Sequence, residues 1–104
     1  HHGTLNAVLL PAVIHFNREA DSVVTDEKID RLAQAMGLPS HVSVEAALQE
    51  KRVALVLPSG LAQMGVTHDL TQRIVTGALA DHSHKTNPRD ATADDYARML
   101  EHSM

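Results

Sequence analysis

The sequence predicts an all-α fold, a compact bundle of about five helices, and two observations carry this prediction. Apolar residues recur at intervals of three and four along most of the chain, which is the spacing of one helical face. Phe16 and Tyr96 are the only aromatic residues, so the core must be built from aliphatic side chains and methionine, which suits packed helices better than a sheet sandwich. With 104 residues the chain is long enough for one domain with a single modest core.

The first predicted helix covers residues 3–16. Pro11 lies in the middle of it and removes one backbone hydrogen bond, so we predict a helix that is kinked at this point. Residues 17–24 are polar and are predicted to form a loop. The residues that define the apolar face of the helix are Leu5, Val8, Leu9, Ala12, Val13 and Phe16.

The second helix is predicted to start at Thr25, because the threonine hydroxyl can cap a free backbone amide. It should end near Met36, where Gly37 and Pro39 supply the stop. The side chains expected to be buried on this helix are Ile29, Leu32, Ala33 and Met36.

The third helix is predicted to run from Ser43 to about Leu57, before Pro58. Residues 52–57 have the composition of a strand, but they continue directly from an alanine-rich helical segment, and this favours a helix. Residues 59–66 contain two glycines and are predicted to form a connector.

A fourth helix is predicted from Thr67 onward, and residues 81–91 are predicted to form a polar loop. The last helix should open at Thr92, which with Asp95 three residues on resembles a capping box, and should run to about His102. The side chains of the fourth helix expected to face inward are Leu70, Ile74, Ala78 and Leu79.

The composition excludes several classes of function. The formal net charge is -4, and the chain has no basic patch of the kind that non-specific nucleic-acid binding requires. It contains no cysteine, so disulfides and thiolate metal sites are excluded. No apolar run approaches the roughly 20 residues of a membrane span. We therefore expect a protein that binds neither nucleic acid nor membrane. The absence of cysteine permits a reducing compartment, and we predict a cytoplasmic location.

The eight histidines are the residues best suited to metal binding, but they are scattered along the sequence. None forms the i, i+4 pair with an intervening Glu that marks a helical zinc-protease site. His82 and His84 could hold a metal from a loop, although a spacing of two is a weak signal, and solvated surface histidines explain most of the set. His1 and His2 could also be the remnant of a purification tag. No catalytic triad or glycine-rich phosphate loop is present, so no catalytic or cofactor-binding residue is predicted.

Three stretches, read in order, carry a resemblance to a known family. The first is His2-Gly3-x-x-Asn6-Ala7-x-Leu9-Leu10-Pro11-x-Val13-x-x-Phe16-Asn17, and the second is Leu57-Pro58-x-x-Leu61-x-x-x-Gly65-Val66. The third is Asp81 followed by Asn87-Pro88-Arg89, Ala91-Thr92 and the closing helix. Together they resemble the C-terminal helical part of the iron-containing (group III) alcohol dehydrogenases. The resemblance spans nearly the whole chain and implies that residues 1–104 form a single C-terminal helical domain.

The resemblance implies that His2 is a metal ligand. In that family the other ligands, an aspartate and two histidines, lie upstream, as does the α/β domain that binds NAD or NADP. His1 stands where the family commonly has proline and is not counted as a ligand. The family often has histidine at the position where the present chain has Ala12, and the present chain therefore lacks one polar group. The implied cofactors are Fe(II) or Zn(II) and a nicotinamide nucleotide, and the implied substrate is a small alcohol or aldehyde.

The resemblance also places the loop that leads to Asn87 near the substrate pocket, which makes His82 and Ser83 candidate pocket residues. Loop polarity alone explains these two equally well. We interpret Asn87-Pro88-Arg89 as structural, with Arg89 tying the loop to nearby carbonyls or carboxylates. Gly3 would allow a close backbone approach, and Asn6 could hydrogen-bond across a domain boundary.

The leading hypothesis is therefore part of a metal-dependent NAD(P) alcohol dehydrogenase, in contact with its own nucleotide-binding domain and compatible with a homo-oligomer. On this hypothesis the isolated chain should be inactive. A maleylacetate reductase within the same superfamily is the first alternative. A free-standing helical binding module with incidental histidines is the second.

Overall fold

The computed structural model describes all 104 residues and contains six α-helices, three 3-10 helices and no strand. The all-α prediction is confirmed, with one more α-helix than the five expected. The α-helices are α1 (His2–Asn17), α2 (Asp21–Thr25), α3 (Lys28–Ala35), α4 (Val44–Ala54), α5 (Thr71–Ala80) and α6 (Ala93–Ser103). The 3-10 helices are η1 (Leu61–Met64), η2 (His68–Leu70) and η3 (His82–Thr86).

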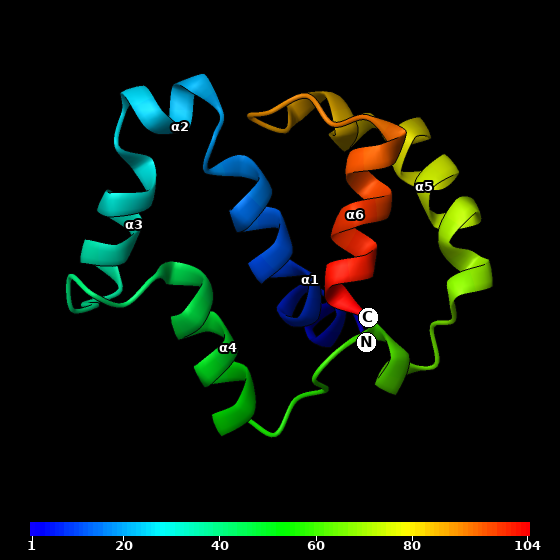
Figure 1. Cartoon of the computed structure of the whole chain (residues 1–104), viewed down its shortest axis with the longest axis horizontal. Coiled ribbons are helices and arrows are strands. Elements are labelled where there is room, and N and C mark those ends of the chain that lie inside the picture. Colours follow the sequence, from blue (N-terminus) through cyan, green and yellow to red (C-terminus); the bar gives the residue numbers. More distant parts are fainter.

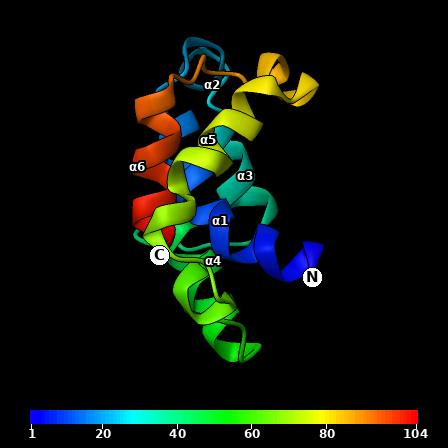
Figure 2. The same cartoon turned by 90° about the vertical axis from the view of Figure 1, so that its right-hand side faces the viewer.

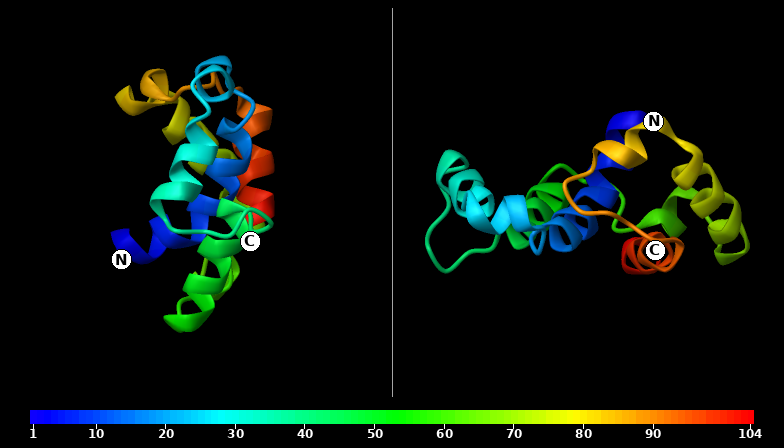
Figure 3. Two further views of the ribbon diagram at one scale, coloured as in Figure 1. Left: turned by 90° about the vertical axis from the view of Figure 1, so that its left-hand side faces the viewer. Right: turned by 90° about the horizontal axis from the view of Figure 1, so that it is seen from above.

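The helices form a flattened assembly around α1 (Figure 1). α1 packs against α4 on one side and α6 on the other, and α5 packs against α6. The principal extents are 39 × 33 × 19 Å. A helix with its side chains is about 10–12 Å wide, so the short dimension is less than two helices thick. Figure 3 shows this thinness when the molecule is seen from above.

α1 continues through Pro11 as one helix, as predicted, and its ribbon changes direction along its length (Figure 2). The N-terminal turns project beyond the rest of the molecule, whereas Val8 and Phe16 of the later turns are buried. The missing N–H of Pro11 gives a physical reason for the bend. None of the helices has both the length and the apolar composition that a membrane crossing requires.

The segment between α1 and α4 differs from its prediction. Residues 21–25 form the short helix α2 inside the predicted loop, and Thr25 ends α2 instead of capping the next helix. α3 begins after Glu27, which adopts a left-handed conformation with φ 50°. It ends as predicted: Gly37 has φ 68°, and the Leu38 amide donates to the Ala33 carbonyl in a Schellman pattern.

The predicted buried stripe of this helix is wrong. No residue of α3 is buried, and Leu32 and Met36 are 36% and 40% exposed. The apolar spacing is real, but the elements that α3 contacts, α2 and α4, do not cover it.

α4 opens as predicted, because the Ser43 hydroxyl accepts a hydrogen bond from the Ala46 amide at 3.1 Å. It ends at Ala54, three residues before the predicted boundary at Leu57. Val56 adopts a left-handed φ of 55°, and the Leu57 amide donates to the Arg52 carbonyl. Backbone capping of this kind ends the helix before Pro58 is reached, and the strand alternative for this segment is excluded.

The fourth predicted helix is divided in two: Thr67 precedes η2, and α5 begins at Thr71. The buried residue of α5 is Val75, which is 3% exposed, whereas Ile74 and Leu79 are 36% and 38% exposed. Ile74 and Leu79 are therefore not buried, although Ile74 faces the cavity between α1, α5 and α6, and the buried position of this helix is Val75. The predicted loop at 81–91 contains η3.

The main hydrophobic cluster lies on the α5–α6 side of α1, while Val23 of α2 and Val44 of α4 are buried outside it. This cluster consists of four buried side chains that come from α1, η1, α5 and α6, namely Val8, Leu61, Val75 and Leu100. The chain end closes over it: the Ala62 amide donates to the Met104 carbonyl at 3.1 Å. A Cβ atom at Gly60 would stand 2.2 Å from that carbonyl oxygen, so this close approach requires glycine.

α6 begins with the capping box expected from the sequence. The Thr92 hydroxyl accepts from the Asp95 amide at 3.2 Å, and the Asp95 carboxylate accepts from the Thr92 amide at 2.9 Å. This pair fixes the start of α6, and with it the position of Tyr96 one residue later.

Candidate functional site

His2 occupies the first turn of α1, in the part of the helix that projects from the molecule (Figure 3). Its side chain is exposed, and its Nε2 atom lies 3.1 Å from the Asn6 amide nitrogen. Asn6 therefore orients the imidazole from one turn further along the same helix. The predicted contact of Asn6 with another domain stays a prediction, as does a close approach at Gly3, where no atom of this chain lies within 4 Å of an added Cβ.

This chain does not hold a complete metal site by itself. No group of three or more His, Cys, Asp or Glu side chains is close enough together to bind an ion. His82 and His84, two positions apart in sequence, contact different partners: His82 lies 3.7 Å from Asp81, and His84 lies 2.9 Å from the Tyr96 hydroxyl. An exposed imidazole such as His2 fits as one ligand of Fe(II) or Zn(II) in a site completed by other residues.

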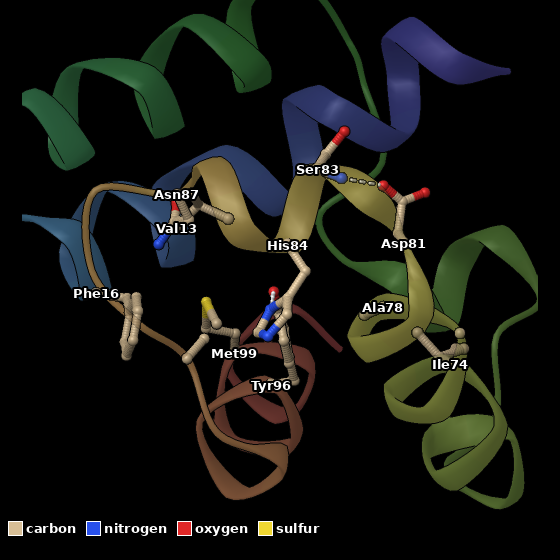
Figure 4. Close-up of a pocket in the computed structure, with 12 residues that line it drawn as sticks. Val13, Phe16, Ile74, Ala78, Asp81, Ser83, His84, Asn87, Tyr96 and Met99 are labelled. Atoms are coloured by element: carbon tan, nitrogen blue, oxygen red, sulfur yellow. Dashed lines mark hydrogen bonds between the residues drawn. The ribbon is translucent and has the colours of Figure 1, made fainter.

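A cavity lies between α1, α5, α6 and η3 (Figure 4). Its volume is about 460 Å³, within the range typical of small-molecule sites. Most of its wall is apolar, and this part consists of Val13, Phe16, Ile74, Ala78, Ala91 and Met99, with Gly77 beside them. The polar part consists of Asp81, Ser83, His84, Asn87 and Tyr96.

The two predicted pocket residues, His82 and Ser83, differ in their position relative to the cavity. Ser83 lines the cavity, whereas His82 does not and its side chain is 95% exposed. The Ser83 hydroxyl lies 3.5 Å from His82 Nε2. A role in substrate binding stays a prediction for both residues.

His84 and Tyr96 are the cavity residues that sequence reasoning missed. His84 Nδ1 and the Tyr96 hydroxyl are 2.9 Å apart, and the two rings are tilted by 52°. Burial raises the pKa of Tyr96, and the nearby Asp81 carboxylate raises it further, so the phenol stays protonated at neutral pH. The pKa of Asp81 is lowered, chiefly because its carboxylate accepts hydrogen bonds from the backbone and side chain of Ser83.

The Asn87–Arg89 segment has the structural role that the sequence predicted. Arg89 donates to the Phe16 carbonyl at 2.9 Å, stands 4.2 Å over the Phe16 ring, and lies 3.5 Å from Glu19. The Asn87 amide exchanges hydrogen bonds with Asn17 at 3.0 and 2.7 Å. These contacts tie the segment after η3 to the end of α1 and so hold one wall of the cavity in place.

Comparison with known proteins identifies the family. The model of the C-terminal region of the Fe-containing alcohol dehydrogenase family matches residues 1–104. The chain belongs to this family. Membership confirms the resemblance carried by the three sequence motifs and favours the enzyme hypothesis over the free-standing binding module.

Individual relatives agree with this assignment. The chain is 54% identical over 104 residues to a 4-hydroxybutyrate dehydrogenase of Cupriavidus necator, covering 100% of this chain and 27% of that protein. It is 32% identical over 111 residues to an NAD-dependent methanol dehydrogenase of Bacillus methanolicus, covering 99% of this chain and 28% of that protein. It is 33% identical over 110 residues to a lactaldehyde reductase of Escherichia coli K12, covering 94% of this chain and 27% of that protein. No solved structure matches the chain. The chain thus spans little more than a quarter of the length of these dehydrogenases and reductases.

Proposed function

We propose that this chain is the C-terminal helical domain of an NAD(P)-dependent dehydrogenase that oxidises a small ω-hydroxy acid of the 4-hydroxybutyrate type, or reduces the corresponding aldehyde. The observation that carries the substrate class is the 54% identity, along the entire chain, to a 4-hydroxybutyrate dehydrogenase. A cavity of about 460 Å³ with a mainly apolar wall suits a short alkyl chain that carries polar groups at its ends.

In this proposal His2 supplies one imidazole ligand to a divalent metal, and residues outside this chain supply the others. Its exposure on the projecting end of α1 leaves it free to meet them, and Asn6 keeps the ring oriented. A metal held there would supply Lewis acidity, which would favour ionisation of the substrate hydroxyl. Fe(II) and Zn(II) both suit such a ligand set.

A bound NAD or NADP would accept hydride from the hydroxyl-bearing carbon, and the hydroxyl proton would leave to solvent. The nicotinamide nucleotide would be bound by the nucleotide-binding domain of the same protein, the partner of this helical domain. Without that domain the 104-residue chain is expected to be inactive. The contribution of this chain is to hold the metal through His2 and to enclose the carbon chain of the substrate between α1, α5 and α6.

The ligand assignment is tested in the full-length enzyme by His2→Ala, with His1→Ala as the matched control. Loss of residues that merely support a metal ligand weakens metal affinity roughly 10- to 100-fold, so loss of a ligand should cost at least as much. We expect His2→Ala to lose most of its metal on dialysis, measured by elemental analysis, and to lose oxidation of 4-hydroxybutyrate. His1→Ala should keep both. Normal metal content in His2→Ala would show the assignment to be wrong.

A further inference from the structure

The polar side of the cavity contains one nitrogen atom that is not used by the protein itself. Asn87 is fully engaged with Asn17 and with the Arg89 carbonyl, at 2.6 Å for the latter. Asp81 is engaged in capping η3 through the Ser83 amide at 2.7 Å. His84 uses Nδ1 to contact Tyr96, while its Nε2 has no hydrogen-bond partner in the chain.

The position of His84 makes this free nitrogen a candidate for ligand recognition. Figure 4 shows the half-buried His84 side chain reaching from η3 toward Tyr96, between Met99 on one side and the α5 residues Ala78 and Ile74 on the other. The contact with Tyr96 fixes the ring, so little rotational freedom is lost when a ligand binds. A fixed polar atom in a mainly apolar wall is the usual means of orienting a small ligand.

The direction of the hydrogen bond between Tyr96 and His84 determines whether His84 Nε2 is a donor or an acceptor. When the Tyr96 hydroxyl donates to Nδ1, the ring proton of a neutral imidazole is on Nε2, which then acts as a donor. A protonated imidazole offers a donor at Nε2 as well. A hydrogen-bond donor at this point suits a carboxylate, which only accepts. Asp81 is the opposing charge on the same wall, and its carboxylate is partly compensated by the Ser83 amide and by His82.

We propose that His84, held in place by Tyr96, binds the carboxylate of the ω-hydroxy acid and is the residue that selects such acids over simple alcohols. This inference rests on the proposed function, because it assumes that the cavity receives the substrate. The apolar residues of α1, α5 and α6 would then contact the methylene groups, and the hydroxyl end would point toward the metal.

The test compares two substrates of the full-length enzyme that share a four-carbon chain, 4-hydroxybutyrate and 1-butanol. His84→Leu keeps a similar volume and removes the donor, and His84→Gln restores an N–H donor. A hydrogen bond to a charged group corresponds to roughly 10- to 100-fold in kcat/KM. We expect His84→Leu to lower the ratio of kcat/KM for 4-hydroxybutyrate to that for 1-butanol by this factor, mainly through KM, and His84→Gln to recover part of it.

The ratio separates recognition from folding, because a misfolded or metal-depleted fraction lowers both rates equally. His68→Leu is the matched control: His68 is 70% exposed on η2 and lies outside the cavity, so the ratio should stay at the wild-type value. If wild-type enzyme prefers 4-hydroxybutyrate but His84→Leu keeps the same ratio, the role of His84 is overturned while the proposed function stands. If wild-type enzyme shows no preference for 4-hydroxybutyrate over 1-butanol, the proposed substrate class itself fails.

Discussion

The helices on the two sides of α1 differ in how far they bury their apolar side chains. On the α5–α6 side, side chains from four separate elements meet in the buried cluster around Leu61 and Val75, and the cavity opens beside it. On the α2–α3 side, α3 has an apolar stripe with the correct helical spacing but buries none of it. The difference teaches that periodicity predicts a helix, whereas burial depends on which elements face that helix.

The largest expected difference between the two sides is in the cost of removing a leucine. Leu61 is 1% exposed, and Leu61→Ala should lower the free energy of unfolding by about 2–5 kcal/mol through lost burial and the cavity it leaves. Leu32 is 36% exposed, and Leu32→Ala should change the free energy of unfolding by no more than about 0.5 kcal/mol. Urea unfolding of both variants measures this contrast. Equal losses would mean that α3 is packed as tightly as the core.

The next largest effect concerns Arg89, which connects the segment after η3 to the end of α1. Arg89→Met removes the hydrogen bond to the Phe16 carbonyl, the contact with the Phe16 ring and the ion pair with Glu19. Because the Arg89 side chain is 37% exposed, we expect a loss of only about 1–2 kcal/mol. Arg73→Met, on the exposed face of α5 and without an ion pair, is the matched control and should be near neutral. Hydrogen exchange should show faster opening of residues 81–91 in Arg89→Met alone.

The sequence predicted the helices well where apolar spacing and capping residues agree. Ser43 and Thr92 both cap the helices assigned to them, because this chemistry is local and depends only on neighbouring residues. Thr25 has the same chemistry but lies at the end of a short helix, since Glu27 takes a left-handed conformation and starts α3 later. Local signals thus fix which residues can cap, while the path of the chain decides which of them do.

The candidate site was predictable only in part. His2 and Ser83 came from motifs that resemble a family, and no spacing rule would have selected them from among other histidines and serines. His84 and Tyr96 are 12 positions apart on different elements, and their contact depends on how η3 folds back over α6. The available signal was indirect: Tyr96 directly follows a capping box that fixes its position, and His84 stands one residue after a candidate pocket residue.

The smallest expected effect is a pH dependence at the start of α6. The pKa of Asp95 is lowered to about 2, first by the Thr92 backbone amide, then by the Thr92 hydroxyl and then by Arg98. Since the folded pKa is below the ordinary value of 3.8, the stabilisation by this carboxylate is fully present above about pH 4 and is lost as the pH falls through about 2.

Asp95→Asn should therefore be less stable than wild type at pH 5, and the difference should narrow steadily between about pH 4 and pH 2. Unfolding measured by circular dichroism over this range checks the expectation. Asp94→Asn removes the same charge from the same turn but leaves the capping box intact, so it separates the cap from a general effect of acidic residues near the helix N-terminus. A constant difference between wild type and Asp95→Asn across this range would mean that the carboxylate does not act through its charge. Tyr96 directly follows Asp95 and lines the cavity, so its fluorescence should report the same unfolding transition. The stability difference between wild type and Asp95→Asn measured in this way should narrow over the same pH range.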